Sequence, residues 1–191
     1  MRLTALQTED GQGPDSELVR RARLGDKRAF AAIVSRHGPA LYRYAYRLLD
    51  EPGSVEDVLQ ETFIDAWRGL PSFRGESSLR TWLFTLTRHR VSRALRGRPA
   101  RPPVDVAELR DRLADPLADP VHIQLGAGLL GALDTALRRL PTRQRSAWLL
   151  REIEDLSYEE IATVLGETST VVRGLLERAR AALATSLKEW R

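Results

Sequence analysis

A break rich in glycine and proline is the feature that most restricts the fold of this chain. It reads GRPARPP over residues 97–103. A helix cannot pass through it, because proline lacks an amide hydrogen and its ring clashes with the preceding turn. On both sides, apolar residues recur every three or four positions, as in amphipathic helices, and no alternating stretch indicates a strand. The sequence therefore predicts an all-α fold of two small helical domains joined by a Pro-rich flexible linker.

The loss and return of the helical period give the bounds of the predicted parts. The period collapses at the break and returns near Leu129. Many proline and aspartate residues lie between, which is typical of an interdomain linker. The predicted parts are a disordered tail at 1–15, an N-terminal domain at 16–96, a linker at 97–127 with a candidate short helix at Val106–Leu113, and a C-terminal domain at 128–191.

Turn residues and caps predict where the helices of the N-terminal domain begin and end. We expect a break at Gly25 and a new helix after the Gly38-Pro39 pair. Ser54 is expected to cap a helix that runs to about Arg68, and Ser78 to cap a long helix after a polar loop.

The composition excludes several classes of protein. Among 191 residues there is no cysteine, so disulfides and thiolate metal sites are excluded, and the three histidines have no ligand spacing. No apolar run approaches the ~18–20 residues of a membrane span, and the N-terminus lacks a signal core. No nucleophile–base set or phosphate-binding loop is present. We therefore expect a cytoplasmic protein that is not an enzyme, with no cofactor, no metal and no membrane insertion.

A segment near the C-terminus predicts two short helices with a tight joint. It reads DLSYEEIATVLGETSTVVRGLLERARAAL. Ser157 and Glu160 have the spacing of a capping box, and Gly166 supplies a turn residue without a Cβ. Thr168 or Ser169 would cap the second helix. The segment is typical of a helix-turn-helix.

Two functions fit this helix pair. The spacing of Ala162, Gly166 and Val172 suits a helix-turn-helix whose second helix enters the major groove of DNA. The alternative is a helical hairpin with a solvated, Arg-rich face. The net charge of +4 is too modest to decide between them. The candidate DNA contacts are Arg143, Ser169, Thr170, Arg173, Gly174, Glu177, Arg178 and Arg180.

Three sequence blocks resemble one family. LRRLPTRQRSAWLLREIEDLSYEEIATVLG is similar to the C-terminal domain of bacterial sigma factors of the extracytoplasmic-function (ECF) group. DVLQETFIDAWR, at Asp57–Arg68, resembles the family's polymerase-binding helix. FRGESSLRTWLFTLTR, at Phe73–Arg88, resembles its −10 element segment. The blocks occur in the family's order, and the resemblance covers Ser16 to about Leu187.

The resemblance implies a role in transcription initiation. It implies a specificity subunit that directs RNA polymerase core to promoters, assists melting at the −10 element and reads the −35 element with its C-terminal domain. The implied partners are polymerase core, through its β′ clamp and β subunit, and promoter DNA as duplex and as melted non-template strand. An anti-sigma factor is a further candidate partner, because many members of the group are held inactive by one.

The first block carries the candidate polymerase face. Its apolar residues are needed for a core, which leaves a mixed polar and apolar face. Glu61 and Asp65 repel each other along a helix, so docking onto a charged partner explains them better than helix stability does. The alternative is an ordinary solvated face. The candidate residues are Asp57, Gln60, Glu61, Ile64, Asp65 and Arg68.

The second block combines arginines, small hydroxyls and aromatic residues, which suits single-stranded DNA. The resemblance implies that the loop at 74–78 captures a flipped base. Trp82 fits either a core position or a wedge against DNA. His89 stands where the family commonly has asparagine. The candidate −10 contacts are Arg74, Glu76, Ser77, Ser78, Arg80, Thr81, Trp82, Arg88, His89 and Arg93.

The second helix of the helix-turn-helix departs from the family pattern. Leu175 stands where arginine is common and Glu177 where histidine is common, so each loses a cation near phosphate. Gly174 replaces a small hydroxyl, and Glu167 an apolar turn residue. We therefore expect weaker or differently specified −35 binding. One alternative function is a sigma-like protein that binds polymerase or an anti-sigma factor without initiating transcription; another is a plain DNA-binding repressor.

Overall fold

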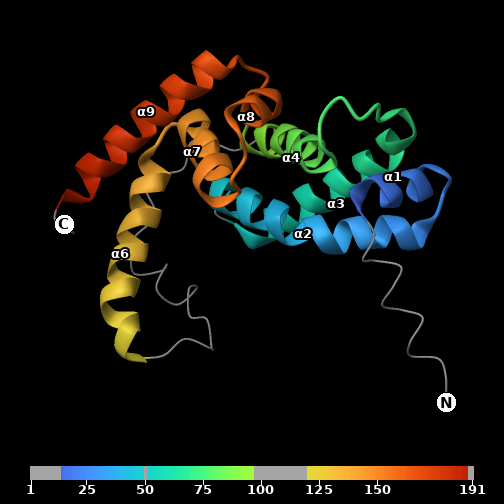
Figure 1. The fold of residues 1–191 in the computed structure, drawn as a ribbon. Helices are drawn as coiled ribbons and strands as arrows, with labels where there is room; N and C mark the ends of the chain where they lie inside the picture. The colour runs from blue at the N-terminus through green and yellow to red at the C-terminus, as the bar shows by residue number, and fades with distance from the viewer. Residues whose placement is uncertain (1–13, 50, 97–119, 189–191) are drawn as a thin grey trace.

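The N-terminal domain is a bundle of four α-helices. The computed structural model describes residues 14–49, 51–96 and 120–188, with side chains from residue 128 onward in the last range. Within these residues the fold is all-α, as predicted (Figure 1). The elements of this domain are α1 (Asp15–Arg23), α2 (Lys27–Leu49), α3 (Pro52–Gly69), the 3₁₀ turn η1 (Leu70–Ser72) and α4 (Leu79–Arg96).

Helix α2 runs without interruption through Pro39, so the predicted new helix after Gly38-Pro39 is wrong. The buried residues before the proline, such as Ile33, continue in line with those after it, such as Leu41 and Tyr44. Packing of this one apolar face outweighs the amide hydrogen that Pro39 removes. The predicted break at Gly25 is confirmed, since its φ of 88° is favourable only for glycine.

The predicted cap at Ser54 is also wrong. Helix α3 begins at Pro52, with Glu51 as its N-cap residue, and Ser54 lies in the first turn. Proline suits the first helical position because the amide that it lacks has no partner there in any helix. The cap at Ser78 is confirmed: its Oγ accepts from the amide of Thr81 at 3.0 Å.

The C-terminal domain contains the predicted helix-turn-helix. The capping box of Ser157 and Glu160 is present, and Gly166 adopts the left-handed conformation with φ 66°. Of the two candidate caps for the second helix, Thr168 serves, accepting from the amide of Val171. The elements are α6 (Pro120–Arg139), α7 (Thr142–Trp148), the π-helical turn η2 (Leu149–Ile153), α8 (Tyr158–Leu165) and α9 (Ser169–Ser186).

Helix α6 begins earlier than the predicted C-terminal domain, so residues 120–127 of the predicted linker lie in a helix. Leu137 and Leu140 near its end pack against Leu183 of α9. The predicted tail at 1–13 and the stretch 97–119, with the candidate helix at Val106–Leu113, lie outside the described residues. None of the described helices is long and apolar enough to cross a membrane.

The two domains are packed against each other, which the sequence did not predict. Helix α8 lies on α4, and α7 on α2 (Figure 1). One apolar core runs through both domains, from Leu18 to Leu176. Within it, the buried hydroxyls of Tyr44 and Ser146 are 2.6 Å apart, and the Tyr44 ring meets Phe84 edge-on. Because a buried hydroxyl needs a partner, this bond specifies how the domains meet.

The cap assignment predicts a difference between two neighbouring hydroxyls. Thr168→Ala should lower the free energy of unfolding by about 1 kcal/mol, because the Val171 amide loses its acceptor. Ser169→Ala, the matched control inside the first turn, should cost less than ~0.5 kcal/mol. Urea denaturation followed by far-UV circular dichroism measures both values. Equal losses, or a larger loss for Ser169→Ala, would contradict the assignment.

Candidate nucleic-acid and partner interfaces

Helix α9 has one apolar face and one polar face. Val172, Leu175, Leu176 and Ala179 are buried against the other helices of the domain. Leu175 therefore fills the core, and treating it as a lost phosphate contact was wrong. Of the predicted −35 residues in this helix, Thr170, Arg173, Glu177, Arg178 and Arg180 are exposed, whereas Ser169 and Gly174 are half-buried.

Two of the predicted −35 arginines are paired with carboxylates of the same domain. Arg143 forms an ion pair with Glu167, the residue that departs from the family's apolar turn position. Arg180 binds Glu152 of η2, with Nη2 2.7 Å from Oε1. A carboxylate beside a guanidinium cancels much of its attraction for phosphate. These two arginines are therefore weaker candidates for DNA contacts than the sequence suggested.

The two other predicted arginines of α9 are not held by a carboxylate among the described residues. The Arg173 guanidinium lies over the Tyr158 ring, 6.0 Å from its centroid, on the exposed face. The Arg178 guanidinium lies close to Gly174, where a Cβ would be 3.3 Å from Nη1. Gly174 thus allows Arg178 to lie along the helix surface. Arg173 and Arg178 are the predicted arginines of α9 for which the described residues show no ion pair.

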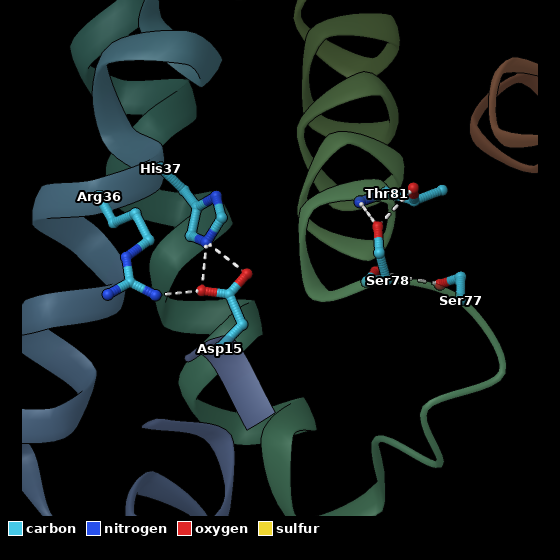
Figure 2. A network of polar contacts seen from close by, with 6 residues as sticks. All are labelled: Asp15, Arg36, His37, Ser77, Ser78 and Thr81. Atoms are coloured by element: carbon cyan, nitrogen blue, oxygen red, sulfur yellow. Dashed lines mark hydrogen bonds and ion pairs between the residues drawn. The ribbon is translucent and has the colours of Figure 1, made fainter. Parts of the chain in front are cut away.

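The loop before α4 is ordered by a small network of hydroxyls. The Ser78 Oγ accepts from the Thr81 amide and lies 2.8 Å from the Thr81 Oγ1, and Ser77 Oγ donates to the Ser78 carbonyl (Figure 2). Gly75, with φ 74°, makes the sharp turn. Arg74 and Glu76 beside it are exposed. The predicted base-capture loop is therefore exposed at its tip and fixed at its junction with the helix.

A second network in Figure 2 fixes α1 to α2. The Asp15 carboxylate accepts from Arg36 at 2.6 Å and lies 3.1 Å from the His37 Nε2. His37 is buried, and it supports packing of the domain. This network lies away from the predicted −10 residues and contains none of them.

Trp82 takes part in the packing, as the core alternative expects. Its ring is half-buried and lies 4.9 Å from the Phe73 ring, against Gly69, where an added Cβ would be 3.1 Å from it. The ring is therefore part of the packing below the loop and remains partly exposed. A partly exposed ring held in place by packing is able to stack on a base.

Arg80 and Thr81 do not face solvent freely, because the C-terminal domain covers them. Thr81 is 1% exposed, and its Oγ1 donates to Glu160 at 3.0 Å. The Arg80 Nη2 lies 3.1 Å from Glu154 Oε2, and Arg43 binds the same carboxylate with two bonds. Sequence reasoning missed Glu154 and Arg43. No local signal could have found them, because their partners are distant in the chain.

The other predicted −10 residues lie further along α4. Arg88 is half-buried, and His89 and Arg93 are exposed. Partial burial, and then the nearby Arg88, lower the pKa of His89 below its ordinary value. The ring is therefore predominantly neutral at pH 7 and offers hydrogen bonds rather than a charge.

The predicted polymerase face of α3 is accessible and is held by Arg90. Asp57, Gln60, Glu61 and Arg68 are exposed, and Ile64 and Asp65 are half-buried. Arg90 of α4 bridges Glu61 at 2.7 Å and Asp65 at 2.5 Å. Its hydrogen bonds, and then its charge, lower the pKa of Asp65 below its ordinary value. Arg90 already relieves the repulsion between Glu61 and Asp65, so this pair does not need a docking partner to explain it.

No group of histidine and carboxylate side chains with the geometry of a metal site occurs among the described residues. The arrangement offers three surfaces: the α3 face, the loop and outer side of α4, and the polar side of α9. Each presents charges and hydrogen-bonding groups for another macromolecule.

Comparison with known proteins gives a consistent result. Residues 33–100 match the family model described as Sigma-70 region 2, and residues 130–183 match the one described as Sigma-70, region 4. The RNA polymerase sigma-H factor of Pseudomonas aeruginosa is 34% identical over 184 residues, covering 93% of this chain and 95% of the relative. The ECF RNA polymerase sigma-E factor of Escherichia coli K12 is 34% identical over 176 residues, covering 88% and 92%.

Two solved structures are similar as well. CnrH, solved in complex with the cytosolic domain of CnrY, superposes with a TM-score of 0.69 at 30% identity, covering 92% of this chain and 97% of CnrH. The sigma factor RpoE of Bartonella quintana, solved with the anti-sigma factor NepR, gives 0.66 at 25% identity, covering 83% and 96%.

The Arg90 bridge predicts a pH-dependent contribution to stability. Because the pKa of Asp65 is lowered in the folded state, the bridge stabilises the fold above the unfolded pKa and is lost as the pH falls through the folded one. Asp65→Asn should therefore be less stable than the parent at pH 7, and the difference should shrink below about pH 4. Asp57→Asn, at an exposed position of the same helix, is the control. Urea denaturation at pH 7 and below about pH 4 measures the difference in stability between the parent and Asp65→Asn. A difference that stays the same at low pH would show that it does not come from the ionised Asp65–Arg90 bridge.

Proposed function

Because the chain belongs to the extracytoplasmic-function sigma factors of the sigma-70 family, which direct RNA polymerase to specific promoters, we propose a division of labour between its two domains. The N-terminal domain, 16–96, docks on polymerase and recognises and melts the −10 element. The C-terminal domain, 128–191, reads the −35 element. The observation that carries this proposal is the order of the two matched regions, each with its own exposed polar surface.

The polymerase contact is assigned to the exposed face of α3. Asp57, Gln60 and Glu61 lie in solvent beside the half-buried Ile64. An apolar residue surrounded by polar ones is typical of an interface, where charges set register and association rate. Arg90 holds Glu61 and Asp65 in fixed positions, so the face is preorganised for its partner. The partner we propose is the β′ clamp, with the β subunit as the second contact of polymerase core.

The −10 contact is assigned to the loop at 74–78 and to α4. Arg74 attracts the strand, Trp82 offers a ring face, and the loop tip is free to receive a flipped base. Extruding a base costs a few kcal/mol, which stacking and hydrogen bonds to the base can offset. The members of this surface are Arg74, Glu76, Ser77, Ser78, Arg80, Thr81, Trp82, Arg88, His89 and Arg93.

The −35 contact is assigned to the polar side of α9. Its N-terminal end, capped by Thr168, presents Ser169, Thr170 and Arg173, the end that enters the major groove in helix-turn-helix proteins. Gly174, Glu177 and Arg178 follow along the same helix. Arg143 and Arg180 lie at the edges of this surface. Their partners Glu167 and Glu152 cancel much of their attraction for phosphate.

We further propose that the protein acts by binding alone and has no enzymatic activity of its own, and that it works in the cytoplasm, where polymerase and promoters are found. An anti-sigma factor is a proposed partner. Two similar sigma proteins were solved with such partners or with a cytosolic domain of another protein.

A second function is favoured by one observation. The polar side of α9 carries Glu177, and two of its arginines are paired within the domain. A sigma-like protein that binds polymerase or an anti-sigma factor without initiating transcription would tolerate such a weakened surface. Transcription in vitro separates the two functions.

The main test is transcription from genomic DNA fragments with core polymerase, followed by sequencing of the transcripts. We expect transcripts with common upstream elements that depend on this protein. No transcript from any fragment, despite polymerase binding, would favour the second function. If the protein does not bind core polymerase, the remaining function is that of a plain DNA-binding repressor.

The α3 face is tested by Asp57→Ala/Gln60→Ala. Removing two exposed interface side chains should weaken polymerase binding roughly tenfold, because truncations near an interface centre cost about 1–2 kcal/mol. Glu56→Ala, at an exposed neighbouring position outside the proposed face, is the matched control. Binding to labelled core polymerase is measured by fluorescence anisotropy. Equal affinities for the double variant and the control would remove this face from the interface.

The α9 surface is tested by Glu177→Gln on a promoter duplex identified by the transcript sequencing. The variant should bind severalfold more tightly at about 50 mM salt, because an anion near phosphate is removed, and the gain should shrink at about 200 mM. Asp155→Asn removes one exposed charge elsewhere in the same domain. No change, or the same gain in the control, would place Glu177 away from the DNA.

A further inference from the structure

Three arginines from two other elements lie around one tyrosine of the helix-turn-helix. Tyr158 is the first residue of α8, and its side chain is half-buried. The Cζ of Arg151 in η2 lies 5.5 Å from the centroid of the ring, and the Cζ of Arg173 in α9 lies 6.0 Å from it. The third arginine is Arg180, about two turns after Arg173 along α9. Neither Tyr158 nor Arg151 belongs to the contacts proposed above for the −35 element.

Groups of the same domain hold the Tyr158 ring in place. Arg151 Nη1 donates to the Leu156 carbonyl at 2.9 Å, which fixes its guanidinium beside the ring. Arg180 donates to Glu152 and to the Tyr158 hydroxyl, and these hydrogen bonds, in that order, raise the pKa of Arg180 above its ordinary value. Both the face and the hydroxyl of the tyrosine therefore have fixed partners.

The backbone before α8 has two uncommon features that shape this contact. Arg151 and Glu152 belong to the π-helical turn η2, and such turns are rare and recur at functional sites. Asp155 follows in the left-handed region, with φ 51°. This backbone places Arg151 over the Tyr158 ring and Glu152 against Arg180, although Arg151 and Glu152 are adjacent in the chain.

Arg173 differs from the other two arginines because its polar atoms have no ion pair among the described residues. Its side chain is exposed, and the contact that fixes it is the one with the Tyr158 ring. An aromatic ring takes the flat face of a guanidinium and leaves the N–H groups at its edge available to phosphate or to a base. A long side chain that is already held loses less conformational freedom when it binds. The tyrosine thus prepares Arg173 for an anionic partner without using its donors.

We propose that Tyr158 is a positioning residue of the −35 surface, which holds the Arg173 guanidinium at the N-terminal end of α9 in the orientation used on duplex DNA. This inference rests on the proposed function, since it uses the proposed −35 surface. It also gives the Arg180–Glu152 pair a role that needs no contact with DNA, because the pair fixes the hydroxyl of the ring on which Arg173 lies. Arg178, which lies along the helix beside Gly174 instead, does not depend on this ring.

The first test measures binding of the full chain to a labelled duplex of mixed sequence, about 30 base pairs long, by fluorescence anisotropy at about 50 mM salt. Phosphate contacts dominate under these conditions, and they do not require the promoter sequence. Tyr158→Leu should weaken binding about twofold to fivefold, the range of a cation–π contact at an exposed site. Tyr158→Phe keeps the ring and should bind nearly as tightly as the parent protein.

The second test asks whether the effect of the ring passes through Arg173. In an Arg173→Ala background, Tyr158→Leu should cause no further loss of affinity, because the group that the ring positions is absent. Arg178→Ala is the matched control: in this background, Tyr158→Leu should weaken binding by the same factor as in the parent. A purely structural role of Tyr158 would instead weaken binding equally in all three backgrounds.

Circular dichroism checks that each variant keeps its helical content. If leucine lowers it, Tyr158→Met, which is long and apolar but has no ring, takes its place in both tests. An equal loss in the parent and in Arg173→Ala would overturn the inference, and so would a phenylalanine variant as weak as the leucine variant. If Arg173→Ala itself leaves duplex binding unchanged, the positioning role is wrong together with the −35 contact of Arg173. Failure of the proposed function as a whole is recognised separately, by the absence of transcripts with core polymerase.

Discussion

The carboxylate of Glu154, enclosed between two arginines where the domains meet, is the constraint on which the arrangement of the molecule depends. An ionised carboxylate that is almost fully buried must be paired, and its partners come from α2 and α4 of the other domain. The apolar core that continues through both domains provides most of the attraction, and it has little directional preference. Glu154, with the buried Tyr44–Ser146 bond, selects one orientation among the many that would bury similar area.

Local chemistry explains what could be predicted from the sequence. The capping box at Ser157, the left-handed Gly166 and the cap at Ser78 follow from contacts within a few residues. The same local reasoning was wrong at Pro39 and Ser54. At Pro39, tertiary packing of α2 outweighs a local helix breaker. At Ser54, a nearby proline at the first helical position determines where the helix begins.

The sequence offers candidate site residues one by one, but it does not show how their charges are paired. A sequence shows that an arginine is present, and only the fold shows which carboxylate it meets. Arg90 of α4 binds two carboxylates of α3, a pairing that no spacing along the chain predicts. Arg143 and Arg180 are likewise paired with Glu167 and Glu152. The contacts join separate helices, and periodicity carries no information about them.

The pairing also changes what the unusual second helix of the helix-turn-helix implies. Leu175 serves the core, and Glu167 has a partner in Arg143, so neither departure from the family pattern is a simple loss of DNA affinity. What remains on α9 for phosphate is chiefly Arg173 and Arg178, with Glu177 opposing them. A small number of phosphate contacts gives weak, salt-sensitive binding of duplex. Under the proposed division of labour, promoter choice by this protein therefore depends more on the −10 surface than on the strength of −35 binding.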